Sequence, residues 1–288
     1  MTIPEARLRC GDTEAVICAS GASIRSLRRA GRPLLREFSG EHPPEAANAV
    51  LAPWPNRVDG AAFEFRGRPH RLRVTEPERG HALHGFTLGT VFTLLTDRER
   101  ARLRAVLGPE EGWPWRIELT VVYEALPEGL RARLSARNLS EVAAPCALGA
   151  HPYLDPQGRP LDECTLLFDA THRLPLGPSL IPLGEREPWS EPAIAMRGRG
   201  FDDAFVHAPG AHEVLLIHPD GRGVALRSAM PWTQLYTSPQ RWLAVEPMTA
   251  PPNALNTGCD LGVLGPGEIL TAEYSVLEIR NERGYLAA

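Results

Sequence analysis

Short runs in which hydrophobic and polar residues alternate dominate this chain. In residues 115–123 a hydrophobic side chain stands at every second position, and residues 130–136 repeat the pattern. A period of two with one polar face is typical of antiparallel strands that have one face in water. The segment 126–129 between the two runs contains Pro127 and Gly129, so it predicts a hairpin turn.

The same alternation predicts further strands along the chain. We expect a second hairpin in residues 62–65 that turns at 66–67, a third from 213–217 through 219–221 to 224–227, and a last long strand over 268–279. Few segments have the helical period. The sequence therefore predicts an all-β fold of many short strands, of the sandwich type.

Turn-forming residues are frequent throughout the chain. It has 26 glycines and 28 prolines among 288 residues, about a fifth of the total, where an average protein has roughly 12%. The proline-rich region 175–192 predicts a long ordered loop or a crossover, because strands resume after it without a change in composition. All-β folds of this length are often single domains. We therefore expect one domain over residues 1–288.

The overall charge gives no reason to expect a polyanionic partner. The formal net charge is −4 and the pI is about 6.2, which favours neither nucleic acid nor an anionic membrane surface. The chain has no run of 18 apolar residues that would cross a membrane. Its first residues lack a basic segment followed by an apolar core, so we expect a cytoplasmic protein.

The chain contains no lysine, and all 31 basic residues are arginine. This excludes a Schiff-base lysine, a pyridoxal-phosphate lysine and a phosphate-loop lysine. The 5 cysteines are odd in number and show no C-x-x-C spacing, so neither a disulfide framework nor a zinc knuckle is expected.

A carboxylate follows an apolar segment near the C-terminal end. Residues 242–245 predict a buried strand, Glu246 comes directly after it, and Pro247, Pro251 and Pro252 follow. We expect the carboxylate at the end of the strand, with a stiff, extended chain beyond it. Such a rigid setting suits a catalytic group. A surface glutamate that caps a strand is the plainer interpretation.

Four other clusters place polar residues where an apolar strand meets a turn, a common position for functional side chains. They are Asn56–Arg57, His81 with His84 and Gly85, His151–Pro152–Tyr153, and Phe201–Asp202–Asp203. Each has a plainer interpretation: a histidine in a turn, a solvated arginine or a turn cap. His81 and His84 have the spacing of a metal pair, but a third ligand would have to come from elsewhere, and we predict no metal site.

Taken in order, these segments resemble the aldose 1-epimerases, the galactose mutarotase family, from about residue 20 to 280. The motifs are Asn56–Arg57, Leu83–His84–Gly85–Phe86, His151–Pro152–Tyr153, Phe201–Asp202, and Val245–Glu246–Pro247 with Pro251–Pro252–Asn253–Ala254. The resemblance implies the family's large antiparallel β-sandwich, the galactose mutarotase-like supersandwich, with a sugar site in a cleft on one sheet.

The resemblance also implies roles for single residues. Glu246 matches the catalytic base, His151 the general acid, and His84 a second histidine near the ring oxygen. Arg57 and Asp202 match residues that bind sugar hydroxyls, with Asp203 as the alternative to Asp202. Asn56 and Tyr153 complete the substrate-binding set that we expect, and Trp54, Phe86 and Trp232 are further candidates to flank the sugar.

The residue types suit this chemistry without the family name. Mutarotation removes a proton from the anomeric hydroxyl and delivers one to the ring oxygen, after which the open chain rotates and closes again. A carboxylate and a histidine can perform both transfers, each contributing about 10²–10⁴-fold. No cofactor, metal or covalent intermediate is needed. We therefore predict a C1 epimerase of a free aldose such as galactose or glucose.

Three other functions stay open at this stage. A hexose-6-phosphate 1-epimerase would need arginines that hold a dianion. A glycoside hydrolase would need two carboxylates about 5–10 Å apart, and Asp202 is the one candidate partner for Glu246. A β-sandwich that binds sugar without catalysis would need neither. The sequence specifies neither the sugar nor the oligomeric state.

Overall fold

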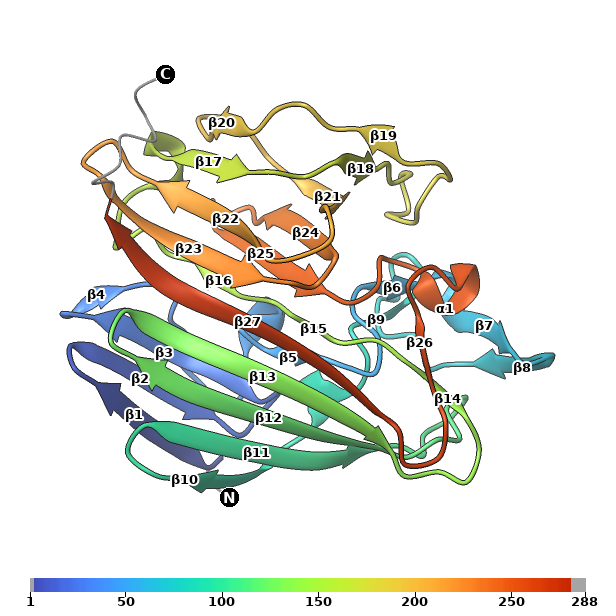
Figure 1. Cartoon of the computed structure of the whole chain (residues 1–288). Helices are drawn as coiled ribbons and strands as arrows, with labels where there is room; N and C mark the ends of the chain where they lie inside the picture. Colours follow the sequence, from blue (N-terminus) through green and yellow to red (C-terminus); the bar gives the residue numbers. More distant parts are fainter. Residues whose placement is uncertain (1–2, 281–288) are drawn as a thin grey trace.

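The computed structural model describes residues 3–280, and its regular structure consists mainly of antiparallel strands (Figure 1). The largest sheet has nine strands in the order β10-β11-β12-β13-β27-β23-β22-β17-β20. Their bounds are Thr93–Thr96 (β10), Arg100–Leu107 (β11), Ile117–Leu126 (β12), Gly129–Asn138 (β13), Ile269–Arg280 (β27), Arg222–Ser228 (β23), His212–Ile217 (β22), Thr165–Phe168 (β17) and Ala193–Ala195 (β20).

The second large sheet has eight strands and carries most of the candidate site. Its order is β19-β18-β21-β24-β25-β15-β5, and β16 pairs with β25 beside β15. The bounds are Glu187–Pro188 (β19), His172–Leu174 (β18), Asp202–Val206 (β21), Trp232–Thr237 (β24), Leu243–Met248 (β25), Gly149–Ala150 (β15), Tyr153–Leu154 (β16) and Val50–Leu51 (β5).

Smaller elements complete the structure. A four-stranded sheet is formed by Glu5–Cys10 (β1), Thr13–Cys18 (β2), Ser23–Arg29 (β3) and Arg32–Pro33 (β4). Three two-stranded ladders pair Arg57–Val58 (β6) with Ala82–Leu83 (β9), Ala62–Phe65 (β7) with Arg68–Arg71 (β8), and Ala144–Cys146 (β14) with Gly262–Leu264 (β26). The helical elements are Ala254–Thr257 (α1) and 3-10 turns at Pro44–Ala46, Asp59–Ala61, Thr87–Gly89 and Leu161–Glu163.

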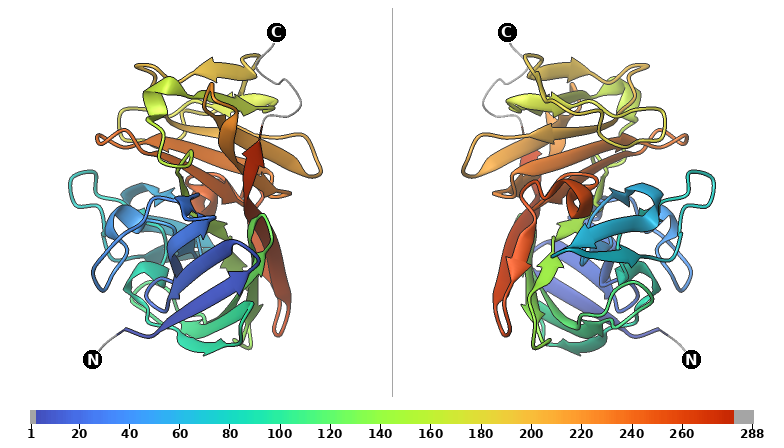
Figure 2. Two further views of the ribbon diagram at one scale, coloured as in Figure 1. Left: turned by 90° about the vertical axis from the view of Figure 1, so that its left-hand side faces the viewer. Right: turned by 90° about the vertical axis from the view of Figure 1, so that its right-hand side faces the viewer.

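The sheets pack as layers around one main hydrophobic core. The four-stranded sheet lies against β10–β13, and the eight-stranded sheet faces the other half of the nine-stranded sheet (Figures 1 and 2). Ile17 of β2, Leu119 of β12 and Val245 of β25 belong to the same buried cluster. Phe168 of β17 and Phe205 of β21 join the two large sheets, with ring centroids 5.0 Å apart. The predicted β-sandwich is confirmed.

The hairpins that alternation predicted are confirmed by the pairing of their strands. The first hairpin closes with Leu126 opposite Gly129. The second closes with Phe65 opposite Arg68. The predicted last strand corresponds to β27, and β22 and β23 form the third hairpin. The proline-rich region contains the short strand β19, which pairs with β18 just before the region, so it is not loop throughout.

The expected end of the strand at Glu246 is wrong. Strand β25 continues through Pro247 to Met248. The backbone N–H groups of Val245 and Thr249 donate to Pro152 and Leu148, on the side of β15 and β16. Position 247 would donate to the same side, where this ladder is interrupted between β15 and β16, so a residue without an N–H fits there. Beyond the strand the chain turns into α1 rather than staying extended.

The last strand is tied to the four-stranded sheet by a buried carboxylate. The side chain of Glu278 on β27 is 4% exposed and pairs with Arg29 and, at 2.8 Å, with Arg32. Replacing it by glutamine would leave two partly buried arginines without their counter-charge. For Glu278→Gln we expect unfolding to become easier by about 2–3 kcal/mol, because both arginines keep some solvent contact.

Urea unfolding followed by circular dichroism measures this effect. The matched control is Glu273→Gln on the same strand, because Glu273 is 47% exposed and pairs with an exposed arginine, Arg133. We expect little change for the control. Equal stability of the two variants would show that the Glu278 cluster contributes nothing.

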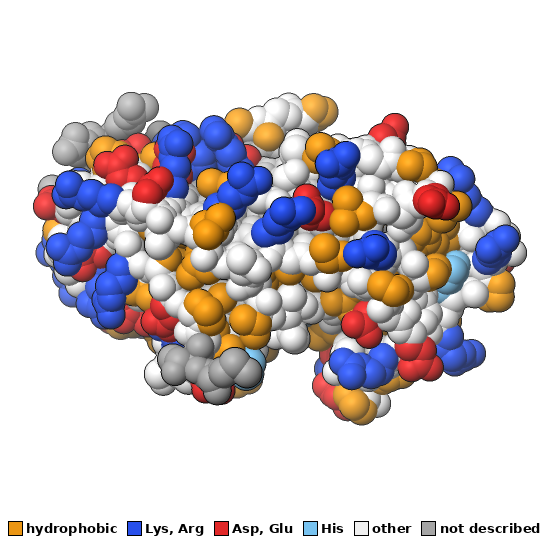
Figure 3. Space-filling view, turned by 90° about the horizontal axis from the view of Figure 1, so that it is seen from below, with side chains coloured by type: hydrophobic (Ala, Val, Ile, Leu, Met, Phe, Trp, Pro, Cys, Tyr) orange, Lys and Arg blue, Asp and Glu red, His pale blue; other side chains and the backbone are white. Residues whose placement is uncertain are grey.

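Charged side chains of both signs cover the lower face of the molecule, with small groups of hydrophobic residues between them (Figure 3). On the outer face of the nine-stranded sheet, Arg100 pairs with Glu124 at 2.6 Å, and Arg104 pairs with Glu118. In residues 3–280, no helix is long and apolar enough to cross a membrane.

Candidate active site

Glu246 stands on the face of β25 that points away from the main core. Its neighbour Val245 points the other way and is fully buried in that core. Across the ladder, Glu246 is paired with Gln234 of β24. Since directly opposed residues of an antiparallel pair share one face, the carboxylate and the amide lie side by side. Both residues are buried, with Glu246 2% exposed.

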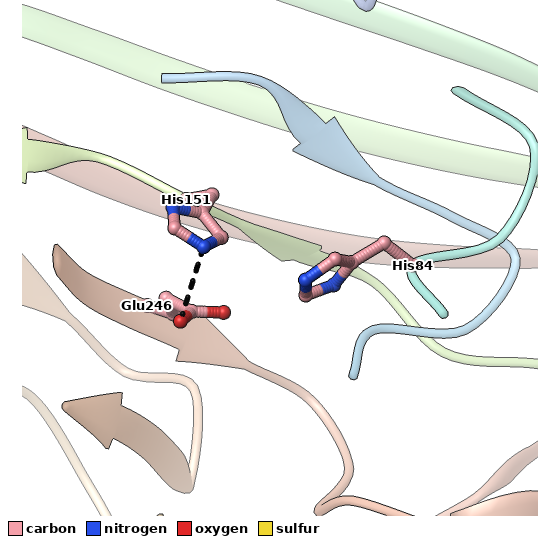
Figure 4. A group of neighbouring side chains, drawn as sticks. All are labelled: His84, His151 and Glu246. Atoms are coloured by element: carbon pink, nitrogen blue, oxygen red, sulfur yellow. Dashed lines mark ion pairs between the residues drawn. The ribbon is translucent and has the colours of Figure 1, made fainter. Parts of the chain in front are cut away.

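His151 faces Glu246 from the other side. The chain from β15 to β16 pairs twice with β25, at Gly149–Met248 and again at Tyr153–Ala244. Continuing this register across the interruption places His151 opposite Glu246. The structure agrees, because His151 Nε2 lies 3.4 Å from Glu246 Oε1 (Figure 4).

His84 approaches the pair from a separate turn, just after β9. Its backbone is in the left-handed region, with φ at 62°, which is uncommon for a residue other than glycine. Two hydrogen bonds to Asn56 hold it: the His84 N–H donates to the Asn56 carbonyl at 3.0 Å, and the Asn56 N–H donates to His84 Nδ1 at 3.1 Å. Strain of this kind is often found at functional sites.

The three side chains converge on one point (Figure 4). One ligand-type atom from each of His84, His151 and Glu246 lies within 4.8 Å of the others. The two imidazole rings meet edge to face, with centroids 5.4 Å apart. All three residues are buried. Three segments that are far apart in the sequence thus bring together the two histidines and the carboxylate that the resemblance singled out.

Arg57 and Asp202 lie beside these three residues. The Arg57 guanidinium donates to both oxygens of Glu76, at 2.8 and 2.9 Å. Arg57 is paired with Leu83, directly before His84, across the β6–β9 ladder, and its positive charge favours the charged forms of the Asp202 and Glu246 carboxyl groups. Burial nevertheless raises the pKa of Asp202 above its ordinary value.

The structure distinguishes Asp202 from Asp203. Asp202 Oδ1 accepts a hydrogen bond of 2.8 Å from Gln234 Nε2, so it lies on the same face as Glu246. Asp203 points to the opposite face, where its nearest cation is Arg173 at 3.5 Å. Successive strand residues alternate between faces, so only Asp202 belongs to the site.

The two other predicted binding residues have different settings. Tyr153 is fully buried, and its ring centroid is 5.0 Å from that of His151. Asn56 accepts the Arg57 N–H at 2.8 Å through its own amide oxygen. Asn56 therefore organises its neighbours Arg57 and His84.

Four buried polar atoms at this site have no hydrogen-bond partner among the described residues. They are Glu246 Oε2, His151 Nδ1, Tyr153 Oη and Gln234 Oε1. Buried polar groups in proteins are nearly always hydrogen-bonded. A site with these four unpartnered atoms suits a small polar molecule with several hydroxyls.

Known proteins of one family resemble this chain over most of its length. The family model of aldose 1-epimerase matches residues 5–277. The chain belongs to the aldose 1-epimerase family. It is 30% identical over 274 residues to the uncharacterized protein YihR of Escherichia coli K12, covering 91% of this chain and 89% of that protein.

Solved structures show that this aldose 1-epimerase family member has the galactose mutarotase-like fold. A galactose mutarotase-like protein from Clostridium acetobutylicum superposes with a TM-score of 0.84 at 17% identity, covering 96% of this chain and 98% of that one. A galactose 1-epimerase from Lactobacillus acidophilus gives 0.81 at 15% identity, with 96% and 94% covered.

Burial favours the uncharged forms of the three central side chains of this family member. It raises the pKa of Glu246 well above its ordinary value, an effect that the Asp202 carboxyl adds to and Arg57 opposes. It lowers the pKa of His151 to about 4. It also lowers the pKa of His84, helped by His151 and Arg57. Glu246 is therefore a stronger base than an ordinary carboxylate, and His84 is uncharged at neutral pH.

Two histidines and a carboxylate could also bind a metal ion, but the hydrogen bonds of His84 argue against it. His84 Nδ1 accepts the N–H of Asn56, and the ring proton of the neutral histidine must then lie on Nε2. A nitrogen that carries its proton is a donor and not a metal ligand. The donor set fits a hydrogen-bonding site better than a metal centre.

Several aromatic and histidine residues that the sequence suggested lie elsewhere. Trp54 and Phe86 pack on each other with centroids 4.9 Å apart, within a cluster around Trp113. Trp232 is fully buried, and its indole N–H donates to Asp260. His81 Nε2 contacts the backbone oxygen of Ser179 at 3.2 Å, so it does not form a pair with His84.

Sequence analysis missed Gln234, Tyr236 and Glu76. The first two lie on the site face of β24, and the Tyr236 ring centroid is 6.5 Å from that of His151. An inward glutamine within an otherwise strand-like segment was the available signal. Glu76 carries no signal of its own, because its contact with Arg57 depends on how the turn before β9 folds.

The turn that carries His84 depends on glycine at the next position. Gly85 has a φ of 69°, and a Cβ atom there would lie 2.1 Å from the carbonyl oxygen of Ala52. For Gly85→Ala we expect a backbone shift that displaces His84, with kcat/KM at least about tenfold lower and a lower melting temperature.

Gly80→Ala, in the turn on the other side of β9, is the control for backbone strain alone. Gly80 has a φ of 74°, but no heavy atom lies within 4 Å of a Cβ placed there. We expect a loss of about 1–2 kcal/mol in stability and an unchanged kcat. Enzyme assays and thermal melts of both variants, run together, separate the clash from the strain. An unaltered kcat/KM for Gly85→Ala would contradict the prediction.

Proposed function

We propose that this protein is a cofactor-independent aldose 1-epimerase that interconverts the α and β anomers of a free aldose such as galactose or glucose. The observation that supports this most strongly is the pair His151 Nε2 and Glu246 Oε1, 3.4 Å apart and buried, with His84 beside them. Membership of the aldose 1-epimerase family supports the same reaction.

In the proposed reaction, Glu246 and His151 together hold one proton. In the reactive form Glu246 is the carboxylate, and it removes the proton from the C1 hydroxyl. The electron pair of that O–H bond becomes the carbonyl bond of the aldehyde, the C1–ring oxygen bond breaks, and its pair goes to the ring oxygen. His151 protonates that oxygen. The pair still holds one proton, now on Glu246.

Ring closure reverses these transfers. Rotation about the C1–C2 bond turns the other face of the aldehyde toward the ring hydroxyl. His151 then takes back the hydroxyl proton as the ring closes, and Glu246 returns its proton to the C1 oxygen. This restores the starting protonation state without a cofactor. The neutral His84 supplies a fixed N–H donor from Nε2 near the reacting oxygens.

The remaining site residues would hold the sugar. Arg57, Asp202 and Gln234 offer donors and acceptors to hydroxyl groups, and Tyr153 offers its hydroxyl beside His151. Arg57 and Arg79 both contact the carboxylate of Glu76, at 2.8 to 2.9 Å. A phosphate dianion would have to compete with this carboxylate, so we favour an uncharged sugar over a hexose 6-phosphate.

Polarimetry with a panel of sugars tests this function. Freshly dissolved α-D-galactose and α-D-glucose should reach their equilibrium rotation faster in proportion to enzyme concentration, in a buffer that catalyses poorly. Acceleration of the 6-phosphates alone would favour the hexose-6-phosphate epimerase. Sugar binding without any acceleration would favour a non-catalytic binding protein, and release of p-nitrophenol from nitrophenyl glycosides would favour a hydrolase.

A further inference from the structure

Glu76 contacts none of the three central residues, yet it holds a residue that lies beside them. Its two carboxylate oxygens accept hydrogen bonds from Nε and Nη2 of Arg57, at 2.8 and 2.9 Å. A two-point contact between a carboxylate and a guanidinium fixes both the position and the plane of the arginine. The rest of the Arg57 guanidinium stays available to the site.

Glu76 is itself held firmly by its own turn. It is 5% exposed, and its backbone carbonyl accepts N–H groups from Arg79, Gly80 and His81. Arg79 also donates to Glu76 Oε1 at 2.8 Å. His81 extends this support, because its Nδ1 accepts the N–H of Gly60 at 3.1 Å. The turn therefore holds the backbone of Glu76, and Arg79 gives its carboxylate one contact that does not depend on Arg57.

We infer that Glu76 is a positioning residue for the reaction: it orients the Arg57 guanidinium for sugar binding and keeps it from pairing with Asp202 and Glu246. This inference rests on the proposed function. Arg57 is paired with Leu83, the residue before His84, across the β6–β9 ladder, and its charge acts on both carboxyl groups. Without Glu76, the arginine would turn toward them and occupy the space where a sugar hydroxyl binds.

The loss of Glu76 would also change the charge around the base. The charged groups that act on Glu246 are Asp202 and Arg57. The titratable rings near it are those of His151, His84, Tyr153 and Tyr236. In Glu76→Gln both Arg57 and Arg79 lose the Glu76 carboxylate, and of these two only Arg57 is among the charged groups that act on Glu246. Without the negative charge of Glu76, the positive charge of Arg57 is no longer balanced, so the net charge near Glu246 becomes more positive. A more positive surrounding lowers the pKa of a carboxyl group.

The test is Glu76→Gln, assayed by polarimetry over a range of pH and of sugar concentration. We expect kcat/KM to fall roughly 10- to 100-fold, mostly through a higher KM, and the acid limb of its pH profile to move to lower pH. Glu78→Gln is the matched control, since Glu78 lies in the same turn with a side chain 67% exposed. It should resemble the wild type.

A second variant separates positioning from general damage. Arg79→Gln removes one contact of Glu76 but leaves the two-point contact with Arg57, so we expect its KM to stay within a few-fold of wild type. A Glu76→Gln protein with wild-type KM and an unmoved pH limb would overturn the inference, whether or not its melting temperature falls.

Failure of the proposed function can be distinguished from failure of the positioning role of Glu76. If the wild type catalyses no interconversion, the function is wrong. The positioning role is then tested by the affinity for galactose or glucose, measured by calorimetry with the wild type and Glu76→Gln. Equal affinities would overturn it, and weaker binding by the variant would support it.

Discussion

Replacing Glu246 by glutamine should lower kcat for anomer interconversion by about 10³-fold or more, with little change in KM. Glutamine has nearly the same shape but is no base at neutral pH, and a positioned general base contributes about 10²–10⁴-fold. The larger value is expected because burial raises the pKa of Glu246, which makes the carboxylate a better proton acceptor. Polarimetry at saturating sugar measures the effect.

The same variant makes a second, independent prediction about stability. A carboxyl group whose pKa is raised on folding stabilises the protein below its unfolded pKa, and this stabilisation is lost as the pH rises through the folded pKa. Glu246→Gln should therefore melt at the same temperature as wild type or higher at pH 8. This advantage should shrink as the pH falls toward 4. A variant that melts lower at pH 8 would show that the charged carboxylate stabilises the fold.

Replacing His151 by glutamine should also abolish most activity, with a fall in kcat of about 10²–10⁴-fold. His151 is the group nearest to Glu246, at 3.4 Å, and it is proposed to exchange a proton with the ring oxygen. Glutamine can still form hydrogen bonds, so the sugar should bind with similar affinity. The measurement is kcat by polarimetry, with sugar affinity by calorimetry.

His207→Gln is the matched control for this variant. His207 is also buried, but it contacts Asp169 and Thr233 at 2.9 Å each, outside the site. We expect it to lose stability and keep its kcat. Equal falls in kcat for the two histidine variants would mean that His151 has no special role in proton transfer.

The fold could be predicted from the sequence because local alternation of hydrophobic and polar residues identifies many of its strands. Alternation in residues 115–136 defines both strands of a hairpin and the turn between them, and the structure closes it at Leu126 and Gly129. The end of the strand that carries Glu246 was harder to predict, because a proline in the sequence usually indicates that a strand has ended. It is tolerated at position 247 since the neighbouring ladder is interrupted there.

The site could be predicted only where residue type and local setting coincide. His84 and His151 each directly follow a short strand, Glu246 lies within β25 next to a proline, and the resemblance to a family placed the three together. Gln234 was missed because the segment 232–237 has polar residues on both of its faces, so alternation does not identify the site face. The choice between Asp202 and Asp203 was open for the same reason, since a shift of one residue reverses the face of a strand.

Glu76 shows what lies beyond sequence reasoning altogether. Its contact with Arg57 arises from a compact turn that is held by backbone hydrogen bonds. Such bonds do not require particular side chains, so the sequence does not reveal them. The ion pair depends on how the turn before β9 folds.

Exchange spectroscopy by NMR at chemical equilibrium tests the central claim most directly. With [1-¹³C]galactose or [1-¹³C]glucose, the account predicts cross-peaks between the α and β anomers whose intensity grows with the concentration of wild-type enzyme and vanishes for Glu246→Gln. Absence of enzyme-dependent exchange for both sugars, or equal exchange in the variant, would contradict it.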